Sequence, residues 1–165
     1  MSRPEVWLRG PLPDVPPLLM PAAHALGGAA EDIRAAAADL TPEQLWSRPG
    51  GAPSVGFHLR HVAGSLDRLL TYARGESLTD AQMAFLQAEG EPGADAAELL
   101  RAVDDTIAIA LAQIRATQSD LLAPRVVGRK KLPSTVIGLL FHAAEHTQRH
   151  TGQIVTTTRI ARGLQ

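Results

Sequence analysis

The sequence contains no cysteine. This absence excludes disulfide bonds, cysteine nucleophiles and cysteine-ligated zinc sites, and it fits a reducing compartment. The chain also lacks any run of about 18 apolar residues, so we expect no transmembrane helix. Its N-terminal stretch has no apolar core of the kind that a signal peptide needs. These absences predict a cytoplasmic protein that has no membrane partner.

The chain also lacks an excess of charge of either sign. It carries 16 Lys and Arg against 17 Asp and Glu, a formal net charge of −1. Proteins that bind nucleic acid electrostatically show a basic patch or a strongly basic balance, so we expect no nucleic-acid partner. The length of 165 residues and the 45% hydrophobic content suit one domain over residues 1–165.

Apolar residues recur with helical spacing in four long stretches of the chain. Residues 55–74 show the pattern most clearly, with apolar residues three and four positions apart. Ser54 is a suitable N-cap for that helix and Gly75 a natural stop. The long helices are predicted at 18–39, 55–74, 95–118 and 135–161. A shorter helix with Thr79 as its cap is predicted at 80–89, and prolines keep residues 1–17 irregular.

The segment "LLAPRVVGRKKLP", residues 121–133, is interpreted as a connector that carries Arg129, Lys130 and Lys131. Ser134 is expected to cap the last helix. No segment shows a convincing strand pattern, so the sequence predicts an all-α fold. The simplest packing of these helices is a four-helix bundle with one short extra helix.

Half of the six histidines lie in one short stretch, "FHAAEHTQRHTGQ", at residues 141–153. His142, His146 and His150 follow one another at intervals of four. Helical residues four apart differ by about 40° around the axis, so neighbouring members of this row share a face. Two such imidazoles can hold one divalent ion. His142 and His150 are about 80° apart, so either the pair His142 and His146 or the pair His146 and His150 could act together.

A third imidazole could come from "FHLRHVAG", which contains His58 and His61. If this helix packs against the last one, His61, His146 and His150 could supply three nitrogens with coordination positions left open. Such a site is typical of a catalytic ion, which acidifies bound water or deprotonates a bound thiol. Thr147 stands where a zincin has its glutamate, and no Glu-x-x-His motif occurs, so a zincin and a ferritin-like di-iron site are excluded.

The chain resembles the DinB/YfiT family of metalloproteins. The resemblance rests on "SVGFHLRHVAGSLDRLLTYARG" at 54–75 and "HAAEHTQRHTGQI" at 142–154. The stretches "LTPEQLWSRPGGAPS" at 40–54 and "GRKKLPSTVIGLLFH" at 128–142 also look like the family. The resemblance therefore covers nearly the whole chain after residue 17. Its most specific element is the second histidine cluster, which ends in H-x-G-Q-I.

The resemblance implies which histidines bind the ion. In this family one helix gives a histidine and a later helix gives two more, spaced by four. These positions fall on His61, His146 and His150. The resemblance therefore favours the pair His146 and His150 over the pair His142 and His146. The resemblance also implies a helical bundle, a homodimer and a divalent ion, most often zinc or nickel, with iron or manganese as alternatives. Some relatives are thiol S-transferases or isomerases that use small thiols such as bacillithiol or mycothiol.

Several other residues are weaker candidates. His58, His142 and Gln153 could orient a ligand or contact a substrate, although a position on the helix surface is an equally simple or simpler interpretation of His58 and Gln153. Trp46 is expected to plug one end of the bundle. Three arginines could meet an anionic thiol or stay solvated, namely Arg60, Arg68 and Arg149.

Two functions of different kinds follow from these residues. The preferred one is a metal-dependent enzyme, either a transferase that acts on a low-molecular-weight thiol or a hydrolase. The alternative is a non-enzymatic module, in which the ion ties two helices together for dimerisation or stress-related binding. An open coordination position would favour the enzyme, and a site closed by a fourth protein ligand would favour the module.

Overall fold

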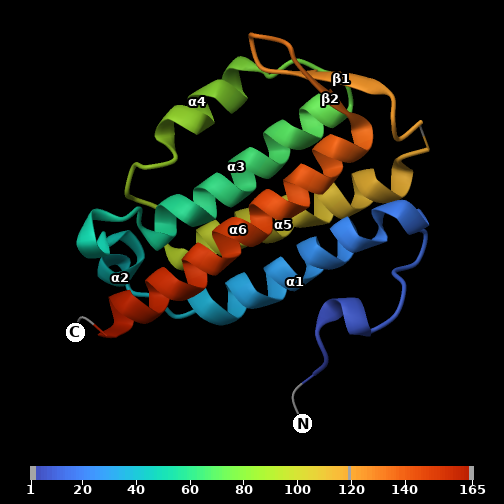
Figure 1. The fold of residues 1–165 in the computed structure, drawn as a ribbon. Coiled ribbons are helices and arrows are strands. Elements are labelled where there is room, and N and C mark those ends of the chain that lie inside the picture. The colour runs from blue at the N-terminus through green and yellow to red at the C-terminus, as the bar shows by residue number, and fades with distance from the viewer. Residues whose placement is uncertain (1–2, 119, 164–165) are drawn as a thin grey trace.

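The computed structural model describes residues 3–118 and 120–163, and four long helices form its bundle (Figure 1). Each long helix packs against two of the others, in the order α1, α6, α3, α5 and back to α1. The prediction of an all-α bundle is therefore confirmed. The four helices are α1 (Met20–Ala37), α3 (Val55–Ala73), α5 (Ala96–Ala116) and α6 (Val136–Gly163).

The ends of α3 follow from capping groups that the sequence predicts. The Ser54 hydroxyl accepts a hydrogen bond from the Phe57 N–H at 3.1 Å. Gly75 ends the helix in the left-handed region at φ +82°, where its N–H donates to the Tyr72 carbonyl. Both predictions are confirmed, and these two groups set where α3 begins and ends.

The core lies where the four long helices meet, and α6 contributes polar residues to it. Thr147 and Thr151 are buried on α6, and each hydroxyl donates to the carbonyl four residues earlier, at 2.8 Å. These bonds satisfy the hydroxyls inside the helix, so threonine is tolerated in a buried position. None of the helices among the described residues has the length and apolarity to cross a membrane.

Shorter elements link the long helices. Thr79 caps α4 as predicted, through a capping box with Gln82. The stretch predicted irregular contains one 3-10 turn, and a second begins at its last residue, Pro17. Its first two residues lie outside the described residues. The short helical elements are η1 (Val6–Leu8), η2 (Pro17–Leu19), α2 (Pro42–Trp46), η3 (Pro49–Gly51) and α4 (Asp80–Ala88).

The prediction of an irregular connector before α6 is wrong, because this segment forms a β-hairpin. Strands β1 (Pro124–Val127) and β2 (Leu132–Thr135) pair antiparallel, and Val127 lies opposite Leu132 across a four-residue turn. Ser134 belongs to β2 and does not cap α6. The hydroxyl of the next residue, Thr135, accepts from the Gly138 N–H at 3.1 Å and takes that role.

Trp46 packs at one end of the bundle against Gly56 at the start of α3. A Cβ at Gly56 would lie 2.7 Å from the Trp46 ring, which is held by a 3.1 Å hydrogen bond from its Nε1 to the Ala94 carbonyl. We therefore expect Gly56→Ala to lower the free energy of unfolding by about 1–3 kcal/mol. Urea unfolding measures this change.

A matched control is Gly152→Ala, inside α6 and with open space around its added Cβ. Alanine is the better helix former, so this change should raise the free energy of unfolding by about 0.5–1 kcal/mol. Equal stabilities for the wild type and Gly56→Ala would contradict the tight contact with Trp46.

Candidate metal centre

Two neighbouring helices supply all the histidines of the candidate site. Helices α3 and α6 lie side by side in the bundle (Figure 1). His58 and His61 come from α3, one helical turn apart, and both lie against α6. The row at positions 142, 146 and 150 comes from α6. The packing that the sequence analysis required for a third imidazole is therefore present.

His61, His146 and His150 form one group. Each offers a ring nitrogen, and these nitrogens all lie within 4.8 Å of one another. The Nε2 atoms of His61 and His146 are 2.9 Å apart, and the His150 ring centroid is 4.4 Å from that of His61 and 4.6 Å from that of His146. Two nitrogens at about 2.1 Å from one ion are about 3 Å apart at a right angle, so the donors fit a divalent ion.

Two of these rings are held through their second nitrogen. The Nδ1 of His150 lies 3.0 Å from Nδ1 of the buried His58, which leaves Nε2 of His150 for an ion. The Nδ1 of His61 lies 2.7 Å from Oε2 of Glu89. Such partners on the far side of a ligand ring are typical of metal-binding histidines.

Burial keeps several of these imidazoles neutral. Burial, together with repulsion by the neighbouring His61, lowers the pKa of His58 to about 4 and that of His150 to about 3. The pKa of His146 is lowered for the same two reasons. The rings of His58, His146 and His150 are therefore neutral at pH 7, and the neutral imidazole is the form that binds a metal ion.

Two further predicted candidates lie outside the group of three. His142 is half exposed, and its Nδ1 lies 3.3 Å from a carboxylate oxygen of Glu145. Gln153 is exposed on α6 and is not part of the cavity wall beside the histidines. Their roles toward a ligand stay predictions.

The three arginines that were candidates for an anionic ligand all have partners in the protein. Arg60 donates to the Ala88 carbonyl at 2.9 Å and lies over the Trp46 ring, 5.2 Å from its centroid. Arg68 is buried in an ion pair with Glu89, and the exposed Arg149 pairs with Glu145. Their side chains are therefore engaged within the fold.

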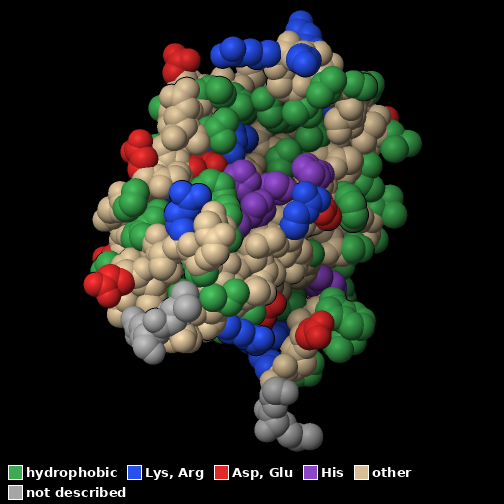
Figure 2. Space-filling model, turned by 60° about the vertical axis from the view of Figure 1, so that its left-hand side comes forward, with side chains coloured by type: hydrophobic (Ala, Val, Ile, Leu, Met, Phe, Trp, Pro, Cys, Tyr) green, Lys and Arg blue, Asp and Glu red, His purple; other side chains and the backbone are tan. Residues whose placement is uncertain are grey.

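A cavity of about 810 Å³ opens beside the histidines, and His61, His142 and His146 form part of its wall. Figure 2 shows histidine side chains gathered near the middle of one face, with Lys and Arg side chains around them. The turn of the unpredicted hairpin adds Arg129 and Lys131 to the wall. Neither forms an ion pair within the described part of the chain, so both are available to a ligand.

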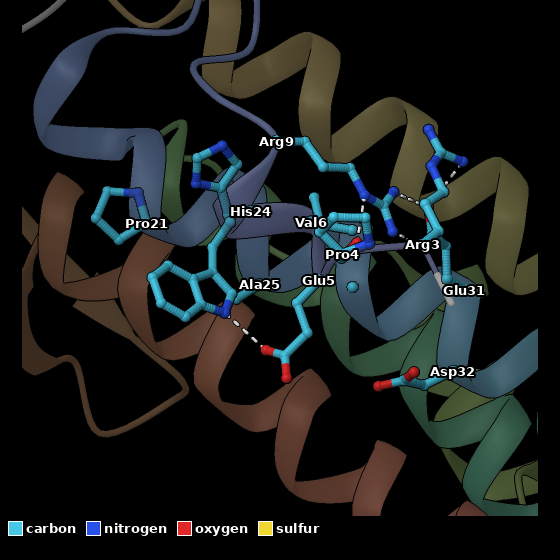
Figure 3. A pocket seen from close by; sticks show the side chains of 12 residues that line it. Arg3, Pro4, Glu5, Val6, Arg9, Pro21, His24, Ala25, Glu31 and Asp32 are labelled. Carbon is cyan, nitrogen blue, oxygen red and sulfur yellow. Dashed lines mark hydrogen bonds and ion pairs between the residues drawn. The ribbon is translucent and has the colours of Figure 1, made fainter. Parts of the chain in front are cut away.

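A second cavity, of about 680 Å³, lies between the N-terminal segment and α1 (Figure 3). Arg9 and Glu31 form a two-bond ion pair in its wall, and His24 Nε2 lies 3.0 Å from the Gly10 carbonyl oxygen. None of the three grouped histidines lines this cavity. It therefore has no part in the candidate metal centre.

Comparison with known protein families places the chain in one superfamily. A family model for the DinB superfamily matches residues 25–154. The chain belongs to the DinB superfamily. DinB proteins typically bind metal, and the matched span contains the three grouped histidines and Glu89. No curated protein matches the chain.

Glu89 was not among the predicted site residues, although it lies at the end of the short helix predicted at 80–89. A single glutamate before glycine carries no local sign of burial, and the periodicity of α4 gives none. The one indirect signal is Gly64, one turn after His61, because a glycine within a helix allows another group to approach the backbone closely. In the structure the α4 segment comes near, with the side chains of Glu89 and Phe85.

Proposed function

We propose that this DinB protein is a divalent-metal-dependent enzyme, and that it transfers a small thiol to an electrophilic substrate. His61, His146 and His150 would hold the ion, with zinc or nickel as the leading candidates. Imidazole suits several divalent metals, so the residues alone do not choose among them. The homodimer and the cytoplasmic location stay predictions.

The observation that carries this proposal is the position of the histidine group on a cavity wall. Within residues 3–118 and 120–163 the group has three members, and two of them, His61 and His146, line the 810 Å³ cavity. A fourth protein ligand would close the coordination sphere, as in structural sites. Three ligands beside an open cavity favour the enzyme over the structural module.

The residues of the cavity suit a small anionic thiol. When bound, a divalent ion stabilises the anion of a coordinated thiol at neutral pH. Arg129 and Lys131 would bind a carboxylate of the thiol and orient its sulfur toward the histidines. Leu69, Met83 and Leu86 give the cavity apolar surface for the electrophile.

The proposed transfer is balanced without an oxidant or reductant. The sulfur forms a bond to an electrophilic carbon of the second substrate, and the leaving group departs with the electron pair of the broken bond. The proton of the thiol passes to solvent. No cysteine of the chain competes for the ion, which suits an external thiol.

The test is absorption spectroscopy of the cobalt-substituted protein, titrated with two small thiols of similar size. We expect 3-mercaptopropionate, which carries a carboxylate, and neutral 2-mercaptoethanol both to produce a sulfur-to-cobalt charge-transfer band. The carboxylated thiol should bind the more tightly. Arg129→Ala and Lys131→Ala should each weaken its binding several-fold and leave the neutral thiol unaffected.

Lys130→Ala is the matched control, because Lys130 belongs to the same turn but not to the cavity wall. It should leave both titrations unchanged. No charge-transfer band with either thiol would exclude thiol binding at the ion. Equal effects of all three substitutions would show that general surface charge, and not the cavity, attracts the thiol.

A further inference from the structure

Glu89 is the one acidic side chain that is buried among the described residues. It follows the last residue of α4, and only 3% of its surface is exposed. The nine residues of α4 itself contain no buried side chain. A buried carboxylate is costly unless charged or hydrogen-bonding partners surround it. The packing of α4 therefore does not explain why the Glu89 carboxylate is buried.

Both carboxylate oxygens of Glu89 are used, and by different partners. Oε2 lies 2.7 Å from Nδ1 of His61, and Oε1 lies 2.8 Å from Nη1 of Arg68. The two partners are seven residues apart on α3, which places them on one face two turns from each other. The carboxylate thus bridges a candidate metal ligand and a buried arginine.

Gly64 makes room for this bridge. It lies on α3 between His61 and Arg68, and a Cβ there would be 2.6 Å from Oε1 of Glu89 and 2.8 Å from Nη1 of Arg68. Contacts that short do not occur at real Cβ atoms. The absence of a side chain at this position therefore allows the carboxylate to approach α3 between its two partners.

The contact determines where the proton of a neutral His61 resides. A carboxylate only accepts hydrogen bonds, so Nδ1 of His61 carries the hydrogen and donates it to Glu89. In a neutral ring the other nitrogen, Nε2, is then unprotonated. That nitrogen lies 2.9 Å from Nε2 of His146, inside the histidine group.

We infer that Glu89 is a positioning residue for the metal ion. It fixes His61 in the Nδ1–H form, holds the orientation of the ring and strengthens Nε2 as a donor, while Arg68 holds the carboxylate in place. This inference rests on the proposed function, because it assigns Glu89 a role at the same ion. It predicts a change in metal affinity that a purely structural role for Glu89 would not produce.

The first test compares Glu89→Gln with Glu91→Gln, an exposed glutamate two residues away. Zinc affinity is measured by competition with a chromophoric chelator. Loss of an outer partner of a ligating histidine typically weakens metal binding about 10–100-fold, and we expect Glu89→Gln to fall in that range. Glu91→Gln should stay within about twofold of the wild type. Equal affinities for Glu89→Gln and the wild type would overturn the inference and leave the proposed function intact.

A double variant separates positioning from stability. Glu89→Gln alone leaves the buried Arg68 guanidinium without a negative charge beside it, and it could weaken binding by disturbing the fold. Arg68→Gln with Glu89→Gln removes both charges, and its thermal stability should return toward that of the wild type. Zinc affinity should remain as low as in Glu89→Gln. Recovery of affinity together with stability would mean that Glu89 is only structural.

A third measurement needs no metal. Long-range ¹⁵N–¹H correlation NMR of the metal-free protein distinguishes the two neutral forms of each histidine ring. We expect His61 in the Nδ1–H form in the wild type, and a larger share of the Nε2–H form in Glu89→Gln. A wild-type His61 protonated on Nε2 would overturn the inference. Failure of the wild type to bind any divalent ion would instead remove the proposed function, and the inference with it.

Discussion

Replacing His146 with alanine should weaken zinc binding by more than about 100-fold. His146 lies close to both other members of the group, with its Nε2 2.9 Å from that of His61 and its ring centroid 4.6 Å from that of His150. Loss of an outer partner alone costs about 10–100-fold, so loss of a ligand should cost more. Elemental analysis of protein purified without a nickel column, followed by zinc titration, measures the effect.

The same variant should lose the stabilisation that metal gives. An ion present at 100 times its dissociation constant stabilises the folded state by about 2.7 kcal/mol, so zinc should raise the melting temperature of the wild type but not that of His146→Ala. His24→Ala is the control, since His24 lies on α1 outside the group. Full stoichiometric metal in His61→Ala and His146→Ala would contradict the ligand set.

Leu66→Ala should lower the free energy of unfolding by about 2–5 kcal/mol. Leu66 lies on α3 and is 0% exposed in the core between the long helices. Truncation loses the buried methyl groups and leaves a cavity that the neighbouring helices only partly fill. Small domains are stable by about 5–15 kcal/mol, so this change removes a large share of the total.

Urea unfolding monitored by circular dichroism measures this loss as a lower midpoint with an unchanged slope. The control is Ile109→Ala on α5, whose side chain is 59% exposed, and its effect should be within about 0.5 kcal/mol. Similar midpoints for the two variants would show that Leu66 is not part of a tightly packed core.

The helices were predictable because each combines a strong apolar period with a clear end. In α3 the stripe of buried leucines starts after the Ser54 cap and stops at Gly75, so the predicted range 55–74 differs from the observed Val55–Ala73 by one residue. The hairpin lacks such signals. Its strands have four residues each, and Pro124 and Pro133 lie within them, so pairing depends on the turn and on contacts with the helices.

The candidate site was predictable where its residues repeat along one helix. The spacing of His146 and His150 predicts a shared face, and the resemblance to the DinB family implied His61 as the third member. The spacing on α6 contains no information about Glu89, which follows α4 and contacts His61 beside Gly64. Partners that come from another element are set by tertiary packing, and no local pattern records them.

The candidate metal ligands and the charged residues proposed to bind the substrate lie on different elements of the fold. On the function proposed above, the metal ligands lie within α3 and α6, whose residues also build the core, whereas Arg129 and Lys131 belong to a turn of four residues, Gly128 to Lys131. We therefore expect changes in that turn to leave the core and the histidine group in place. Relatives and engineered variants can therefore diversify the molecules they accept by varying one short surface segment while their chemistry stays the same.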